Sequence, residues 1–138
     1  MKSSTARRAE VYVDTSALIA ALDRSDSHHV VYARLFAEPP PLVTSSLVIA
    51  EGHGWFLRRY HQHKALQFLA FIGELTPLAV LAFGPDELRK AGELAKKLAD
   101  QNVTLADTHG LVIMRERRIK ACWSTDRHLG LTGAGLVM

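Results

Sequence analysis

One stretch decides the fold of this chain: Val11-Tyr12-Val13-Asp14-Thr15-Ser16-Ala17-Leu18-Ile19. Three β-prone residues run directly into a carboxylate, and an apolar pattern with helical spacing begins at Leu18. The pattern predicts a strand that ends in Asp14 and turns at once into a helix. In open α/β sheets, ligands bind in the crevice beyond the carboxyl ends of the strands, so Asp14 is a candidate ligand. Because Asp is also a favoured helix cap, this stretch alone leaves both roles open.

The rest of the chain alternates between strand and helix patterns. We predict strands at residues 10–14, 42–44, 78–82 and 120–124, with an edge strand at 136–137. Helices are predicted at residues 15–22, 27–37, 47–60, 64–72, 85–100 and 104–118, followed by a turn at 126–129. This alternation is typical of a parallel sheet with helices on both faces. We therefore expect one α/β domain over residues 1–138, a sandwich with a central, mostly parallel sheet of four to five strands and a loose lead-in at residues 1–9.

The composition bounds the class of protein. The chain has 138 residues, of which 48% are hydrophobic and 22% charged, as in an ordinary soluble domain. We expect no membrane span, because no apolar run approaches the length of roughly 18 residues that one needs. The single cysteine, Cys122, excludes an internal disulfide and a cysteine-based zinc cluster, which suits a reducing cytoplasm. The net charge of +3 suits a polyanion such as nucleic acid, and a merely solvated surface explains it equally well.

Two further acids lie near the starts of predicted helices. Glu51 borders an apolar helix face, because helical spacing stacks it with Leu47 and Trp55. A glutamate at the edge of an apolar stripe would look the same. Asp107 ends the segment Thr104-Leu105-Ala106-Asp107, which fits the capping-box pattern. Capping alone explains the residue type at this position, and it does not exclude a ligand.

Asp126 repeats the arrangement at Asp14, because it follows a predicted strand and two hydroxyl residues. Two strands that deliver carboxylates at the same end would form one acidic crevice. Clustered carboxylates repel one another, so such a crevice needs cations, and all-oxygen ligation favours Mg²⁺ or Mn²⁺. One or two such ions would activate water for attack on a phosphodiester. Thr15 and Ser124 are predicted to orient ligands or water. The candidate catalytic residues and metal ligands are Asp14, Glu51, Asp107 and Asp126.

These motifs resemble those of a known family. The segment Val13-Asp14-Thr15-Ser16-Ala17-Leu18-Ile19 is similar to the opening motif of PIN-domain nucleases, especially the VapC-type toxins of bacterial toxin–antitoxin pairs. Glu51 and Asp107 match the second and third acids of that family, and Ser124-Thr125-Asp126-Arg127-His128-Leu129 matches its closing motif. Two departures are Ser124, where the family more often has Thr, and Gly110, an unusual choice that would loosen its helix.

The resemblance implies a PIN-like sandwich and a Mg²⁺- or Mn²⁺-dependent endoribonuclease. It also implies a homodimer that a small cognate antitoxin of the VapB type holds inactive. The alternative is a non-catalytic PIN-like module that binds RNA or a partner without turnover. A phosphatase of the haloacid-dehalogenase type is disfavoured, because Ser16 occupies the position of its second Asp. A dinucleotide-binding domain is disfavoured as well, because no Gly-x-Gly-x-x-Gly follows the first strand.

Two other features have open interpretations. The apolar helices over residues 47–72 carry more hydrophobic surface than a small sheet covers, so we expect part of it to form a dimer or antitoxin interface. His53, His109 and His128 lie close in sequence to candidate acids, and each is either a neighbour of the site or an ordinary core or surface histidine.

Overall fold

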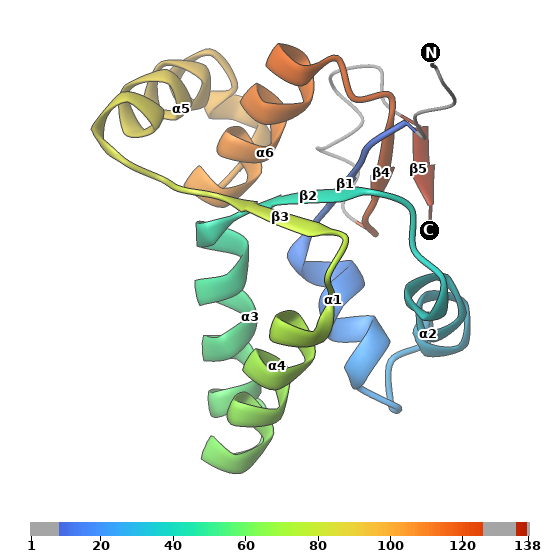
Figure 1. Ribbon diagram of the computed structural model, residues 1–138. Helices are drawn as coiled ribbons and strands as arrows, with labels where there is room; N and C mark the ends of the chain where they lie inside the picture. Colours follow the sequence, from blue (N-terminus) through green and yellow to red (C-terminus); the bar gives the residue numbers. More distant parts are fainter. Residues whose placement is uncertain (1–8, 126–134, 138) are drawn as a thin grey trace, which may run out of the picture.

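The computed structural model describes residues 9–125 and 135–137, which form a five-stranded sheet covered by helices (Figure 1). Neighbouring strands all run parallel, and their order across the sheet is β3-β2-β1-β4-β5. The strands are β1 (Val11–Val13), β2 (Leu42–Ser45), β3 (Leu78–Leu81), β4 (Ala121–Trp123) and β5 (Gly135–Val137). The predicted α/β fold with a mostly parallel sheet of four to five strands is confirmed.

Helices cover both faces of the sheet, as the alternating pattern predicts. They are α1 (Thr15–Leu22), α2 (His29–Ala37), α3 (Ser46–Arg59), α4 (Gln62–Glu74), α5 (Pro85–Lys97) and α6 (Leu105–Arg117). In Figure 1, α1 to α4 lie below the sheet, and α5 and α6 lie above it. Each face has its own apolar core, one shared with α1 to α4 and the other with α5 and α6.

Both cores begin in the opening strand. Successive side chains of a strand point to opposite faces, so Val11 and Val13 enter the core on the side of α1 to α4. Tyr12 enters the other core, where it is fully buried beside Leu111 of α6 and Cys122 of β4. A strand buried on both faces has no polar alternation. This explains why the first strand is a continuous apolar run in the sequence.

Most element boundaries differ from the predicted ones by one to three residues, and the shifts in β1, α4 and α5 are explained by local contacts. Strand β1 is shorter than residues 10–14, because Glu10 lies outside it and pairs with Arg117 instead. Helix α4 begins at Gln62 rather than at Lys64, because the imidazole Nδ1 of His61 accepts a hydrogen bond from the Lys64 amide. Helix α5 ends at Lys97 rather than at residue 100, since a separate 3₁₀ turn over Ala99–Gln101 follows it.

The parallel register brings three strand ends to one edge of the sheet. Val13 pairs with Trp123, and the amide of Asp14 donates to the carbonyl of Trp123 at 3.0 Å. On the other side of β1, the hydroxyl of Thr44 donates to the carbonyl of Val13 at 2.6 Å. The ends of β1, β2 and β4, which we call the carboxyl edge, are therefore neighbours, and α1 and α3 both begin there.

Apolar side chains remain exposed on the pair formed by α3 and α4 and on the adjacent edge strand. Leu57, Leu66 and Leu69 are 40–52% exposed, and Val80 of β3 is 44% exposed. The sequence predicted excess apolar surface in this region, and the structure places it on one side of the sheet. No helix in the described residues is long and apolar enough to cross a membrane. The predicted turn at 126–129 and residues 1–8 of the predicted lead-in lie outside the described residues.

Candidate functional site

Asp14 is a buried carboxylate at the centre of the carboxyl edge. It follows β1 directly and is only 5% exposed. Its Oδ2 accepts hydrogen bonds from the hydroxyls of Ser124 at 2.9 Å and Ser16 at 3.0 Å. Burial raises the pKa of Asp14 from 3.8 to about 6, the hydrogen bond from Ser124 opposes the rise, and the charge of Asp107 adds to it. Asp14 is therefore a carboxylate in a site that already carries excess negative charge.

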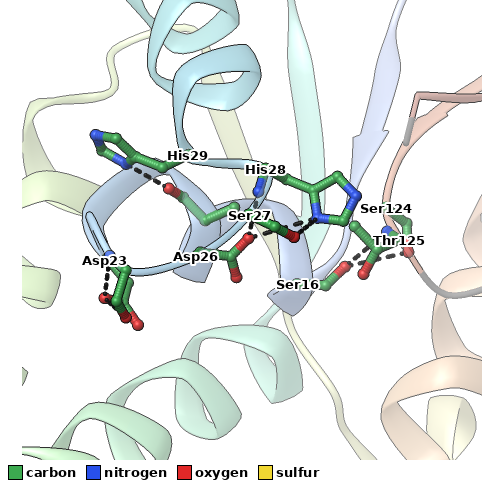
Figure 2. Close-up of polar contacts among 10 residues, drawn as sticks. Ser16, Asp23, Asp26, Ser27, His28, His29, Ser124 and Thr125 are labelled. Carbon is green, nitrogen blue, oxygen red and sulfur yellow. Dashed lines mark hydrogen bonds and ion pairs between the residues drawn. The ribbon is translucent and has the colours of Figure 1, made fainter.

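Ser16 connects the two strand ends that carry predicted acids. Its hydroxyl oxygen lies 3.3 Å from that of Ser124 and accepts a hydrogen bond from the Thr125 amide at 3.0 Å (Figure 2). Thr125 immediately precedes Asp126, which lies outside the described residues. Sequence reasoning assigned Ser124 to this neighbourhood and missed Ser16. The available signal was the hydroxyl two residues after Asp14, in the first turn of a helix that starts at the carboxyl edge.

Glu51 joins the site through Thr15. It lies on the exposed side of α3, and its Oε1 accepts a hydrogen bond from the hydroxyl of Thr15 at 2.7 Å. Thr15 is the first residue of α1 and is itself buried. This contact crosses between two helices whose sequences are far apart. Thr15 therefore holds one oxygen of Glu51 next to the start of α1, where Asp14 lies.

Asp107 forms the predicted capping box at the start of α6. Its Oδ2 accepts from the Thr104 amide at 3.0 Å, while its own amide donates to the Thr104 hydroxyl at 3.1 Å. The residue is partly buried. Its charge is one cause of the raised pKa of Asp14, so the two carboxylates lie within electrostatic reach of each other. Capping and proximity to Asp14 are therefore both features of Asp107.

The described acids are near one another without forming a closed cage. In residues 9–125 and 135–137, no three Asp, Glu, His or Cys side chains converge closely enough to hold a metal ion. Within the same residues, the ion pairs of Lys and Arg involve Glu10, Glu93 and Glu116, and none involves Asp14. A buried carboxylate that lies within electrostatic reach of a second one, and that pairs with no Lys or Arg among the described residues, fits a divalent cation with oxygen ligands.

Of the histidines in the described residues, His109 has a defined contact at this edge, whereas His29 has one near the other end of α1. His109 is 2% exposed, and its Nδ1 lies 2.6 Å from the hydroxyl of Ser45, the last residue of β2. Burial lowers the pKa of His109. His29 contacts the carbonyl of Ala20 through its Nδ1 at 2.7 Å (Figure 2), which makes it a link between α1 and α2. His53 lies partly exposed on α3, and His128 lies outside the described residues.

Asp23 is a second buried aspartate, and it differs from Asp14 in its surroundings. It is also 5% exposed, and its Oδ1 accepts from the amide and hydroxyl of Ser25 and from the hydroxyl of Tyr60. Burial raises the pKa of Asp23, but these hydrogen bonds and the charge of Arg59 outweigh it and lower the pKa overall. Asp23 is thus a satisfied structural residue that ties the loop after α1 to the end of α3.

Comparison with known proteins identifies both the sequence pattern and the fold. The family model described as PIN domain matches residues 11–133. Comparison with curated proteins gives no significant match. Among solved structures, VapC20 of Mycobacterium tuberculosis, described as a sarcin–ricin loop cleaving toxin, superposes with a TM-score of 0.81 at 25% identity. The match covers 90% of this chain and 95% of that one.

Two further solved structures share the fold at lower identity. One is a toxin–antitoxin complex from Klebsiella pneumoniae, with a TM-score of 0.60, 18% identity and coverage of 93% of this chain and 96% of that chain. The other is VapBC2 from Rickettsia felis bound to a DNA fragment from its promoter, with a TM-score of 0.61 and 15% identity. That match covers 93% of this chain and 97% of the other. The resemblance that the four acids and their motifs indicated is therefore confirmed.

Proposed function

This chain belongs to the PIN domain family, and from that premise we propose that it is a metal-dependent endoribonuclease, the toxin of a toxin–antitoxin pair. RNA is its substrate, which it would meet in the cytoplasm, and the carboxyl edge of the sheet is its active centre. The matching structure of VapC20, which is described as cleaving the sarcin–ricin loop, supports an RNA phosphodiester as the bond that is cut.

Four acids would hold one or two Mg²⁺ or Mn²⁺ ions: Asp14, Glu51, Asp107 and Asp126. Such an ion, when bound, lowers the pKa of a coordinated water and balances negative charge that builds on the phosphodiester. The hydroxyls of Ser16 and Ser124 hold one oxygen of Asp14 and so fix the orientation of its carboxylate. Thr15 fixes one oxygen of Glu51 in the same way. These contacts preorganise the acids before substrate arrives.

The observation that carries the proposal is the environment of Asp14. A carboxylate that is 5% exposed ordinarily needs a basic partner; within the described residues, this one accepts hydrogen bonds from two serine hydroxyls, lies within electrostatic reach of Asp107 and forms no ion pair with Lys or Arg. A helix cap alone does not require that arrangement. The arrangement is the one expected of an acid that binds a cation, because ligands of parallel sheets bind at the carboxyl ends of the strands.

The deciding experiment is RNA cleavage by the purified chain with Mg²⁺, with Mn²⁺ and with a chelator. Sarcin–ricin loop RNA is the first substrate, and transfer RNA and messenger RNA are offered beside it. We expect the chelator and Asp14→Asn each to abolish cleavage. Asp23→Asn is the matched control, because it alters an equally buried aspartate outside the site. Cleavage that survives both chelator and Asp14→Asn refutes the metal mechanism. RNA binding without any turnover by the wild type would favour the non-catalytic alternative.

Two protein partners follow from the family: a second copy of the chain and a VapB-type antitoxin. The exposed apolar side chains of Leu66, Leu69 and Val80 provide a surface for one of them. Two matched structures are a toxin–antitoxin complex and a VapBC assembly, which supports an antitoxin partner. Sedimentation of the wild type and of Leu69→Glu, alone and with the coexpressed antitoxin, separates the two uses of this surface. A monomer that binds no antitoxin refutes both.

A further inference from the structure

A short buried hydrogen bond links α6 to the start of α3. The Nδ1 of His109 lies 2.6 Å from the hydroxyl oxygen of Ser45, and the two residues are 2% and 0% exposed. They are separated by 64 positions in the chain. Both polar groups have almost no access to water, so the loss of either partner leaves the other buried without a hydrogen bond.

The direction of this hydrogen bond follows from the other contact of Ser45. Its hydroxyl oxygen already accepts from the Leu47 amide at 3.0 Å and so caps α3. We assign the remaining hydroxyl proton to this contact, which makes Nδ1 of His109 the acceptor. This requires the neutral tautomer with its proton on Nε2. The hydroxyl of Ser45 thus caps the start of α3 and also forms a hydrogen bond to α6.

A second contact closes the same junction. The amide of Phe83, in the loop between β3 and α5, donates to the hydroxyl of Ser46 at 3.1 Å. The ring of Phe83 meets the imidazole of His109 edge to face, with 5.0 Å between the ring centroids. The imidazole is therefore held by a hydrogen bond on one side and by an aromatic ring on another, which leaves it little freedom to rotate.

The junction connects two of the acids that we assign to the active centre. Asp107 lies two residues before His109 on α6, and Glu51 lies in the second turn of the helix that Ser45 caps. We propose that the hydrogen bond between His109 and Ser45 makes His109 a positioning residue, which fixes the first turn of α6, and with it Asp107, relative to Glu51. This inference rests on the proposed function. His109 itself touches neither substrate nor cation in this assignment.

The test compares His109→Leu, which removes the acceptor and keeps the bulk, with His109→Asn, whose side-chain carbonyl can accept from Ser45. Thr108→Val is the matched control. It lies on the same helix and is fully buried, and within the described residues its hydroxyl donates to the Leu105 carbonyl of its own helix. Mn²⁺ affinity is measured by calorimetry without RNA. The kcat and KM of cleavage are then measured with an RNA that the wild type cleaves. Circular dichroism confirms that each variant is folded at the assay temperature.

We expect His109→Leu to weaken Mn²⁺ binding by about 10–100-fold and to lower kcat while the KM for RNA stays the same. His109→Asn should recover most of both losses, and Thr108→Val should match the wild type in both. His109→Leu with wild-type Mn²⁺ affinity overturns the inference, as does an equal loss in Thr108→Val. A wild type that neither binds Mn²⁺ nor cleaves RNA overturns the proposed function and the inference together, so the two failures are distinguishable.

Discussion

Replacing Asp14 by Asn should stabilise the metal-free chain, although it removes an acid of the proposed active centre. Asp14 is 5% exposed, and burial raises its pKa from 3.8 to about 6. The folded state therefore binds the carboxyl proton more tightly than the unfolded state does. Keeping Asp14 ionised at neutral pH lowers the free energy of unfolding, and a shift of roughly two pKa units corresponds to about 3 kcal/mol.

The sign of the effect fixes its pH dependence. Above the folded-state pKa of about 6, Asp14 is ionised in both the folded and the unfolded state, and its burial lowers the free energy of unfolding by the full amount. As the pH falls from about 6 toward 3.8, the folded chain takes up the proton first and the cost disappears. Asn does not ionise. The variant should therefore be more stable than the wild type by about 1–3 kcal/mol at about pH 8, and this difference should be smaller by about 1 kcal/mol at about pH 5.

Urea denaturation of both proteins at the two pH values, with a chelator present, measures this difference. A gain of about 2 kcal/mol would also raise Tm by about 8 °C in a domain of this size. Asp23→Asn is the control with the opposite sign, because hydrogen bonds and the charge of Arg59 lower the pKa of Asp23. That carboxylate stabilises the folded state when ionised, so Asp23→Asn should destabilise it at about pH 8. An Asp14→Asn variant no more stable than the wild type at either pH would refute the reasoning.

Four other outcomes are expected. Mn²⁺ at about 100 times its Kd should add about 2.7 kcal/mol to the unfolding free energy of the wild type and nothing to that of Asp14→Asn, measured by thermal melting. Gly110→Ala should destabilise by about 1–3 kcal/mol in urea, because its Cβ would lie 2.7–2.9 Å from the phenol of Tyr12. Gly92→Ala, with nothing within 4 Å of its Cβ, should instead stabilise by up to about 1 kcal/mol. Thr15→Val should slow RNA cleavage at least about tenfold through the lost hydrogen bond to Glu51, and Thr15→Ser should retain most of the rate.

The order and type of the elements were predictable because their signals are local. An apolar run or a helical period reports on neighbours in the chain, and the sheet and its six flanking helices in the described residues follow from such patterns. Boundaries depend on weaker signals. His61 is not among the favoured cap residues, so its role at the start of α4 was not visible. Helix α5 ends at Lys97, and the 3₁₀ turn that follows it ends at Asn102, whose left-handed conformation, with φ of 60°, no sequence pattern predicted.

The parts of the site that the sequence did not reveal depend on contacts between distant segments. Ser16 reaches Thr125 and His109 reaches Ser45 across 109 and 64 positions, and no local period indicates either contact. The role of Gly110 also depends on a contact between distant segments. The sequence suggested a glycine that loosens its helix, whereas the structure shows the ring of Tyr12 in the space that a Cβ would need. The glycine allows α6 to approach the sheet closely, and so brings the start of that helix toward the carboxyl edge.

Asp14 and Asp107 both lie at the start of a helix, and the structure separates their roles. Asp107, in the first turn of α6, completes a capping box, because the Thr104 amide donates to its Oδ2. Asp14 occupies the N-cap position of α1, yet its side chain makes no capping hydrogen bond, and two serine hydroxyls hold it instead. Capping therefore does not offset the cost of burying it. Under the proposed function, an acid that lowers the stability of its own fold is placed there to bind a cation, so one substitution, Asp14→Asn, should make the chain both more stable and inactive.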